Sequence, residues 1–410
     1  MNHKKIIIIC FLLCFIVACK KQTTLPVFPQ KTLGNTYQSH RYKDRLTTAQ
    51  LTTRLASFYP NVDSILHPKY DVIVYRIFYT THDYQNNAIT ASGLVYVPEI
   101  SNYYCPVICF QHGTCIQKQE VPSISADLNY YVPFIMASET GAIVCAADYI
   151  GLGFSDGVAH FYEPTEEANA VVDMLGSVQV LLNKTLRKIT FNSSVFLMGY
   201  SQGGHATLAA QQRLETQYST QFKLMASAPM ASWFSLSKSS QLNILKDSVS
   251  FPFSAAYACL INSIQTIAHP YTGYDKIFIK PYDSLTNILF DGSKSAGYAN
   301  TQYPQVFINT LQKEFVDEMK HNSTNAFITA IQKIDILEGW TPKAPTHFYH
   351  SILDEVAFYD NSVLAYNTFH QKGGNVQLIN LGNYTHAEAN LKAIQQVRDW
   401  FYPIVKITPY

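Results

Sequence analysis

The chain has 410 residues, and its 30 Lys and Arg residues nearly balance 29 Asp and Glu residues, which gives a formal net charge of +1. Nucleic-acid-binding proteins usually carry a clear basic excess, so this balance argues against nucleic acid as a partner. Hydrophobic residues make up 47% of the chain, which is ample for a large core and excludes wholesale disorder. The length is compatible with two or three domains, or equally with one large α/β domain that contains an insertion.

The N-terminal residues have the pattern of an export signal. Two lysines precede an apolar run, Ile6 to Val17, which is too short to span a bilayer as a helix. The run ends in Ile16-Val17-Ala18-Cys19, which resembles the lipobox of bacterial lipoproteins, cleaved before the cysteine. We therefore expect a signal peptide over 1–18 and a lipid-modified Cys19, because several acyl chains anchor a protein stably. The alternative is an ordinary signal peptide that happens to contain Cys19.

The sequence predicts a protein that is anchored to the cell envelope rather than spanning a membrane, because no later segment is apolar for long enough to cross one. Lys20 and Lys21 follow the cysteine without an acidic residue, which favours the outer membrane of a Gram-negative cell. Residues 19–45 mix polar residues and proline without periodicity, so we expect a tether between the lipid and the folded body.

Cysteine usage predicts neither a disulfide framework nor a metal site. Five cysteines remain beyond Cys19, which is an odd number, and two of them, Cys105 and Cys109, lie in or near one strand where they cannot readily pair. We expect buried free thiols. The chain has no Cys-x-x-Cys or His-x-x-x-His pair, so we expect no metal and no cofactor.

Hydrophobic patterning predicts an α/β fold. Thr48 to Phe58 favours a short helix with Thr47 or Thr48 as its N-cap. Tyr70 to Phe78 and Ala91 to Val97 are typical of strands, joined by turn-forming residues into an antiparallel hairpin. Short apolar runs then alternate with helical patterns, as buried parallel strands and helices do; the runs are Pro106–Phe110, Ala142–Ala147, Ser194–Met198 and Lys223–Ser227. We expect a mostly parallel central sheet with helices on both faces.

One motif indicates nucleophilic catalysis. Gly199-Tyr200-Ser201-Gln202-Gly203-Gly204 follows a predicted strand and precedes a helical stretch, His205–Glu215, which is the context that a nucleophile elbow requires. Such a turn strains the backbone of the serine and lifts its hydroxyl above the sheet, and side chains in place of the glycines would collide with neighbouring elements. Ser201 is therefore the predicted nucleophile. A glycine-rich helix start, which is the structural alternative, does not need a serine at the apex.

A serine hydroxyl needs a base, and the base needs an orienting acid; in hydrolases built this way the acid and the histidine follow the serine in that order. Pro345 to His350 is predicted to be a strand, and Asp354 follows it at the carboxyl end, where α/β active sites form. Glu355 is the rival acid. His386 lies on the loop after the last predicted strand, so it is the predicted base for Ser201.

Other histidines fit the role of base less well. His205 is predicted to be packed within a helix, and His347 alternates within a strand. His350 is closer to Asp354 in sequence than a triad partner should be.

Acyl transfer also requires donors for an oxyanion. The backbone N–H of Gln202 is one predicted donor, because it directly follows the nucleophile. The second is predicted at Thr114, or at Gly113, which allows a tight turn after a strand, while His112 would act as a structural brace. Alternatively, His112 and Gly113 form only a strand-ending turn.

Several blocks, taken in order, resemble α/β-hydrolase lipases and esterases related to the secretory lipases. The blocks are Ala91–Pro98, Gln111–Thr114, Ala147-Asp148-Tyr149-Ile150-Gly151-Leu152-Gly153, Gly199–His205 and Trp340–Pro345, followed by the Asp354 and His386 segments. The resemblance implies an α/β-hydrolase fold and hydrolysis of carboxylic esters, and it favours Asp354 over Glu355. Ser351 and Ala387 depart from the family pattern, which has glycine at both positions, and these departures concern the substrate rather than the chemistry.

The predicted domain organisation has the hydrolase core in two parts, 46–234 and 341–410, with a helical cap inserted over 235–340. Aromatic residues recur in the cap, where they either pack on its own core or form an acyl-binding pocket. We expect a monomeric, lipid-anchored serine esterase or lipase. The alternatives are a peptidase of the prolyl-oligopeptidase type and a non-catalytic binding lipoprotein on the same fold.

Overall fold

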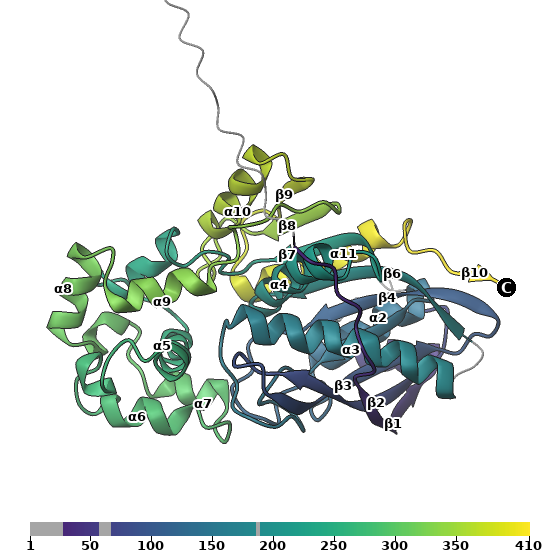
Figure 1. Cartoon of the computed structure of the whole chain (residues 1–410), viewed down its shortest axis with the longest axis horizontal. Helices are drawn as coiled ribbons and strands as arrows, with labels where there is room; N and C mark the ends of the chain where they lie inside the picture. Colours follow the sequence, from purple (N-terminus) through teal and green to yellow (C-terminus); the bar gives the residue numbers. More distant parts are fainter. Residues whose placement is uncertain (1–27, 57–66, 186–188) are drawn as a thin grey trace, which may run out of the picture.

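The computed structural model describes residues 28–56, 67–185 and 189–410 (Figure 1), so the predicted signal peptide and Cys19 lie outside the described residues. In these residues one central sheet has the strand order β1-β2-β3-β5-β4-β6-β7-β8-β9, with β10 paired to β4. The strands are β1 (Tyr37–Leu46), β2 (Val72–His82), β3 (Ala88–Pro98), β4 (Tyr103–Gln111), β5 (Ile143–Ala147), β6 (Ile189–Tyr200), β7 (Lys223–Met230), β8 (Thr346–His350), β9 (Val376–Asn380) and β10 (Thr408–Pro409).

The sheet has an antiparallel edge and a parallel body. β1, β2 and β3 pair antiparallel, and β3 pairs antiparallel with β5. From β5 through β4, β6, β7 and β8 to β9 every pairing is parallel, so these strands place their carboxyl ends at one edge of the sheet. The predicted hairpin is β2–β3. Three of the predicted apolar runs lie within β4, β6 and β7, and the fourth, Ala142–Ala147, begins one residue before β5.

Helices cover both faces of the sheet (Figure 1). Side chains of β4 alternate: Ile108 and Phe110 pack toward α1 (Thr48–Ala56), α2 (Leu128–Thr140) and α11 (His386–Phe401), whereas Val107 and Cys109 pack toward the opposite layer. That opposite layer contains α3 (Pro164–Thr185) and α4 (Gln202–Gln217), while α10 (Asp360–Gln371) packs on β8 and β9. The strands of the body are therefore buried on both sides, which explains their continuous apolar runs.

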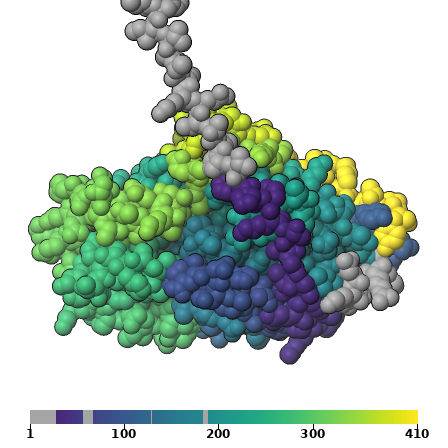
Figure 2. Space-filling view, in the orientation of Figure 1, coloured from purple at the N-terminus to yellow at the C-terminus, as the bar shows by residue number. Residues whose placement is uncertain are grey.

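The segment between β7 and β8 forms a helical lobe with its own apolar core, drawn in green in Figures 1 and 2. Its helices are η2 (Ser240–Leu245), α5 (Ser254–Ala268), η3 (Tyr274–Lys276), α6 (Tyr282–Leu289), α7 (Ala296–Thr301), η4 (Phe307–Thr310), α8 (Lys313–His321) and α9 (Ala326–Ile334). The lobe's aromatic residues mostly pack against one another; Phe251, Tyr257 and Phe278, for example, are fully buried within it.

The N-terminal part of the described chain corrects the predicted tether. Residues 37–46 form the edge strand β1, and the preceding residues lie against α3 and α4, where Thr36 Oγ1 donates to Asp173 O at 2.7 Å and Lys31 N donates to Gln217 O at 2.6 Å. Figure 2 shows this segment crossing the surface of the core. The prediction failed here because β1 exposes most of its polar side chains, so it lacks the apolar alternation of a half-buried strand.

Candidate active site

The chain makes a sharp turn between β6 and α4, and Ser201 stands at its apex. Ser201 has φ 59° and ψ −128°, a backbone conformation that non-glycine residues rarely adopt. Two backbone hydrogen bonds hold the turn: Ser201 N donates to Met230 O at 3.0 Å, and Gly204 N donates to Ser201 O at 2.8 Å. The local structure is therefore the strained strand–turn–helix predicted from the sequence.

The glycines of the motif permit this turn to pack against β4 and β7. A Cβ atom on Gly203 would lie 2.1 Å from Gln111 O, and one on Gly199 would lie 2.3 Å from Gly203 O. A Cβ on Gly204 would lie 2.4 Å from Met230 O. All three are backbone atoms that cannot move aside easily, so side chains are excluded at these positions.

His386 and Asp354 are joined by a short hydrogen bond. His386 Nδ1 lies 2.7 Å from Asp354 Oδ2, and the Asp354 side chain is fully buried whereas the His386 side chain is 15% exposed. Since a carboxylate only accepts, the proton of this bond sits on Nδ1 and leaves Nε2 of the neutral imidazole as an acceptor. Asp354 Oδ1 accepts from the backbone N–H groups of Val356 and Ala357, at 3.0 and 2.7 Å.

The rival acid, Glu355, contacts His386 at a different atom. Glu355 Oε2 accepts from the backbone N–H of His386 at 3.0 Å, so it holds the start of α11 and not the ring. Tyr200 O–H donates to His386 O at 2.7 Å, and the two rings lie 4.9 Å apart between centroids. Burial raises the pKa of Tyr200, helped by the nearby Asp354 and Glu355 carboxylates, so the phenol remains a donor.

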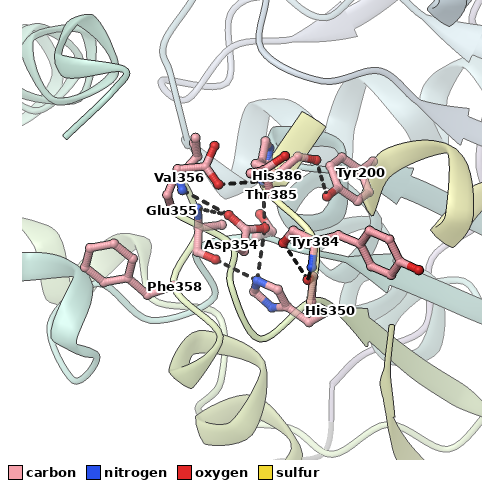
Figure 3. A network of polar contacts seen from close by, with 12 residues as sticks. Tyr200, His350, Asp354, Glu355, Val356, Phe358, Tyr384, Thr385 and His386 are labelled. Atoms are coloured by element: carbon pink, nitrogen blue, oxygen red, sulfur yellow. Dashed lines mark hydrogen bonds and ion pairs between the residues drawn. The ribbon is translucent and has the colours of Figure 1, made fainter. Parts of the chain in front are cut away.

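A second histidine, His350, also contacts Asp354 (Figure 3). The sequence analysis rejected His350 as the catalytic base. The fully buried His350 ring places Nε2 2.6 Å from Ala357 O and 3.3 Å from Asp354 Oδ2. A carbonyl oxygen only accepts, so Nε2 carries a proton, and Nδ1 is 2.7 Å from Ser362 Oγ. The Nε2–H group of His350 therefore donates to Ala357 O and makes a longer contact, at 3.3 Å, with the carboxylate oxygen that accepts from His386.

The electrostatics of Asp354 follow from these contacts. Burial raises the pKa of the Asp354 carboxyl, but hydrogen bonds from His350 and His386 outweigh the burial and hold the pKa well below its usual range. The carboxylate therefore stays ionised at neutral pH while it is fully enclosed by protein. Four donors surround it, which is what a buried charge requires.

Ser201 and His386 line the same cavity, which has a volume of about 280 Å³. The cavity lies at the carboxyl ends of the strands, between the elbow, the loop after β4, and the helices α2 and α11. From the helical lobe the aromatic residue Phe253 lines the cavity, while most of the lobe's aromatic residues pack on the lobe's own core. Its full lining is Phe110, Gln111, Gly113, Thr114, Asn129, Val132, Tyr200, Ser201, Phe253, Val356, His386, Asn390 and Ile394.

The predicted oxyanion loop lies beside the elbow. A Cβ on Gly113 would be 3.9 Å from Ser201 Cβ, and Thr114 lines the cavity with Ser201. His112 is fully buried, with its ring 4.1 Å from that of Tyr149 and its Nδ1 2.7 Å from Gly113 O, so its contacts are those of a brace. Gln202 N is the first amide of α4, and such amides lack an acceptor within the helix.

The sequence reasoning missed Glu167, a buried residue of α3 that holds the start of α4. Its Oε1 accepts from Gln202 Nε2 at 2.9 Å, and its Oε2 lies 2.6 Å from His205 Nδ1. His205 is buried in α4, as predicted. Glu167 thereby fixes the residue whose amide is the first predicted oxyanion donor, but no local motif marks it, because its partners are 35 and 38 residues away.

The remaining cysteines are buried free thiols; they are Cys105, Cys109, Cys115, Cys145 and Cys259. Burial raises the pKa of the Cys105 thiol to about 12, so it stays protonated and unreactive. Within the described ranges, no three or more His, Cys, Asp or Glu side chains are grouped to hold a metal ion. In the same part of the chain no helix has the length and apolar character needed to cross a membrane.

Comparison with solved structures gives the class of the protein. A hydrolase structure from Legionella pneumophila subsp. pneumophila superposes with a TM-score of 0.82 at 23% identity, over 90% of this chain and 98% of that one. The rice cell wall degrading esterase LipA from Xanthomonas oryzae gives a TM-score of 0.76 at 25% identity, over 89% and 97%. Candida antarctica lipase A in its closed state gives 0.64 at 16% identity, over 89% and 82%. The fold is therefore that of the α/β-hydrolase lipases and esterases.

The family is given by the sequence itself. Residues 123–401 match the model of the secretory lipase family, which is more than half of the chain, so the protein belongs to that family. None of the curated proteins compared with the chain matches it. Family and neighbours together indicate a hydrolase of the lipase and esterase type, and membership of a secretory family indicates export.

Proposed function

We propose that the protein is a serine esterase that cleaves carboxylic esters through Ser201, His386 and Asp354. The observation that carries the proposal is the 2.7 Å bond between Asp354 and His386 Nδ1, at the wall of the cavity that Ser201 also lines. That bond leaves His386 Nε2 free to take a proton, which is the state a general base needs. The strained elbow presents the serine hydroxyl to the same space.

The proposed mechanism uses each residue in one role. Ser201 Oγ attacks the ester carbonyl while His386 Nε2 accepts its proton, and Asp354 stabilises the imidazolium that forms. The amides of Gln202 and Thr114 bind the oxyanion of the tetrahedral intermediate. His386 then protonates the leaving alcohol, and water activated by the same histidine hydrolyses the acyl-enzyme.

Ser201→Ala tests the nucleophile. We expect purified Ser201→Ala to keep the fold and to lose hydrolysis of 4-nitrophenyl butyrate by a factor of about 10⁵ or more, as at comparable serines. Ser219→Ala, which changes an exposed serine two residues beyond the end of α4, is the matched control and should behave as the wild type. A Ser201→Ala protein that keeps a substantial share of the activity would remove the proposal.

A peptide 4-nitroanilide, assayed in parallel, separates the esterase from the peptidase alternative. We expect the wild type to hydrolyse the ester and not the anilide. A protein active on neither substrate would instead fit a non-catalytic binding protein on this fold.

We further propose that the exported protein is anchored to the cell envelope through a lipid on Cys19, on the side of the outer membrane that faces the periplasm. The support is the lipobox-like run Ile16-Val17-Ala18-Cys19 after an apolar segment. Acyl chains on one cysteine would hold the enzyme at a surface without a spanning helix.

A further inference from the structure

The cavity beside Ser201 has three carboxamide side chains that the proposed chemistry does not use, and one of them, Gln111, already accepts from Thr207 Oγ1. Most of its other lining residues around the reacting groups are apolar, including Phe110, Val132 and Ile394. The other two carboxamides are Asn129 in the first turn of α2 and Asn390 in α11. An apolar cavity with a few placed polar groups is the usual design of a specific ligand site, because the polar groups fix which ligand binds and how.

Among the residues of α11 that line the cavity, Asn390 is the next one after His386. His386, Asn390 and Ile394 are spaced by four residues in α11, so they lie on one face of that helix and all three line the cavity. Asn390 is one turn beyond His386. A substrate whose ester lies at Ser201 and His386 therefore shares its cavity with the Asn390 carboxamide.

The carboxamide of Asn390 is unsatisfied in the described part of the protein. Its Oδ1 is enclosed by protein and has no hydrogen-bond partner among the described residues. Buried polar atoms nearly always have a partner, so the Asn390 carboxamide would gain by turning its oxygen toward the cavity, where a bound ligand can supply the missing partner. Rotation by half a turn exchanges its nitrogen and oxygen, and a hydroxyl group, which both donates and accepts, pairs with either orientation.

We propose that Asn390 is a specificity-determining residue that binds a hydroxyl group of the substrate. The preferred substrates are then esters with a hydroxyl close to the scissile carbonyl, in the acyl or the alcohol part, and not plain alkyl esters. This inference rests on the proposed ester hydrolysis at Ser201.

Two pairs of esters that differ by added hydroxyl groups test the proposal. The first pair is 4-nitrophenyl butyrate and 4-nitrophenyl 3-hydroxybutyrate, which varies the acyl part; the second is propyl butyrate and glycerol monobutyrate, which varies the alcohol part. We expect the wild type to favour the hydroxylated member of at least one pair by about tenfold in kcat/KM, the effect of one net hydrogen bond. Asn390→Leu should bring that ratio close to one.

Gln395→Leu is the matched control, because it removes a carboxamide from α11 at a position that does not line the cavity. It should keep the wild-type ratio. Asn390→Ala adds no bulk and provides the same measurement if Asn390→Leu does not fold, as judged by circular dichroism.

The outcomes separate the two proposals. A wild type that hydrolyses none of the four esters removes the proposed function, and this inference with it. A wild type that hydrolyses them without preferring either hydroxylated member overturns the inference alone. A preference that persists in both Asn390 variants also overturns it, because the hydroxyl would then be bound elsewhere.

Discussion

At the scale of single residues, His386 is held at three of its atoms by two segments of the chain, the loop after β8 and the end of β6. Asp354 accepts from the ring, Glu355 accepts from the backbone N–H, and Tyr200 donates to the backbone carbonyl. Only the contact with Asp354 selects the tautomer, because the other two act on the backbone. The two adjacent acids therefore have separable roles (Figure 3): Asp354 sets the protonation of the His386 ring, and Glu355 holds the His386 backbone in place.

This separation predicts different outcomes for the two acids. Asp354→Asn should lower kcat for ester hydrolysis at least about a hundredfold, because an amide in that place no longer fixes the tautomer or stabilises the imidazolium. Glu355→Gln keeps an oxygen that can accept from His386 N and should cost far less. Steady-state kinetics of both variants decide the matter: if the losses are reversed, Glu355 is the acid, and if neither variant loses activity, the acid lies elsewhere.

His350 should affect the pH dependence. Its Nε2 lies 3.3 Å from the same Oδ2 of Asp354 that accepts from the ring of His386. Removing His350 removes one of the contacts that hold the pKa of the Asp354 carboxyl low, so this carboxyl is protonated at higher pH and the support for the imidazolium is lost earlier on acidification. We therefore expect His350→Phe to move the acid limb of kcat/KM toward higher pH by about half a unit. His347→Phe, which keeps an aromatic ring beside Trp400 and does not touch Asp354, is the control. An acid limb that His350→Phe leaves in place, or moves downward, contradicts this role.

The sequence could supply some of these residues and not others, for a physical reason. Ser201 has a local motif, and the order of elements places Asp354 and His386 at strand ends, where α/β sites form. Glu167, by contrast, contacts its partners only because α3 packs on α4, and no spacing in the sequence encodes that contact. His350 is too close to Asp354 in sequence to be its triad partner, and only the turn after β8, which the sequence does not define, brings the His350 ring against the carboxylate.

At the scale of elements, the elbow depends on how closely α4 approaches β4. The backbone of Gly203 touches that of Gln111, so even one methyl group there would force the helix away from the strand. We expect Gly203→Ala to lower the free energy of unfolding by about 1–3 kcal/mol, as overpacking does, and to lower kcat by displacing Ser201. Urea unfolding and ester hydrolysis measure the two effects.

Gly297→Ala is the control for this substitution. Gly297 lies in α7, where an added Cβ meets no atom within 4 Å, so the change should be neutral or should stabilise the protein by up to about 1 kcal/mol. If Gly203→Ala were as stable and as active as Gly297→Ala, the close approach of α4 to β4 would not be a requirement of the site.

Helices and strands could be predicted where their burial requires a regular pattern of apolar residues. The body strands are buried on both faces, and their apolar runs located β4 to β7 within a few residues. Thr47 accepts from Gln50 N, as the predicted N-cap of α1 should. Edge strand β1 was not predicted, because half of its residues are exposed to solvent and only Leu46 is buried, so its sequence lacks a regular apolar alternation.

At the scale of the whole molecule, the N-terminal segment connects the proposed anchor to the core. The described chain begins with residues that lie on α3 and α4 and continue into β1, so the connection to Cys19 is shorter than the predicted tether of 19–45. Residue 28 is only nine positions after Cys19. A fully extended chain spans at most about 3.6 Å per residue, so a lipid on Cys19 would hold the core within roughly 32 Å of the membrane.

The last prediction concerns where the enzyme resides. Wild-type protein expressed with its own N-terminus should sediment with membranes, and Cys19→Ser should appear in the soluble fraction or remain unprocessed, because acylation requires the cysteine thiol. Cys105→Ser is the matched control, since it changes a buried thiol of the core and should leave the distribution unchanged. Mass spectrometry of the mature N-terminus gives an independent reading. A mature protein that begins well away from Cys19, or Cys19→Ser protein that remains in the membrane fraction after cleavage, would show that some other feature holds the enzyme at the envelope.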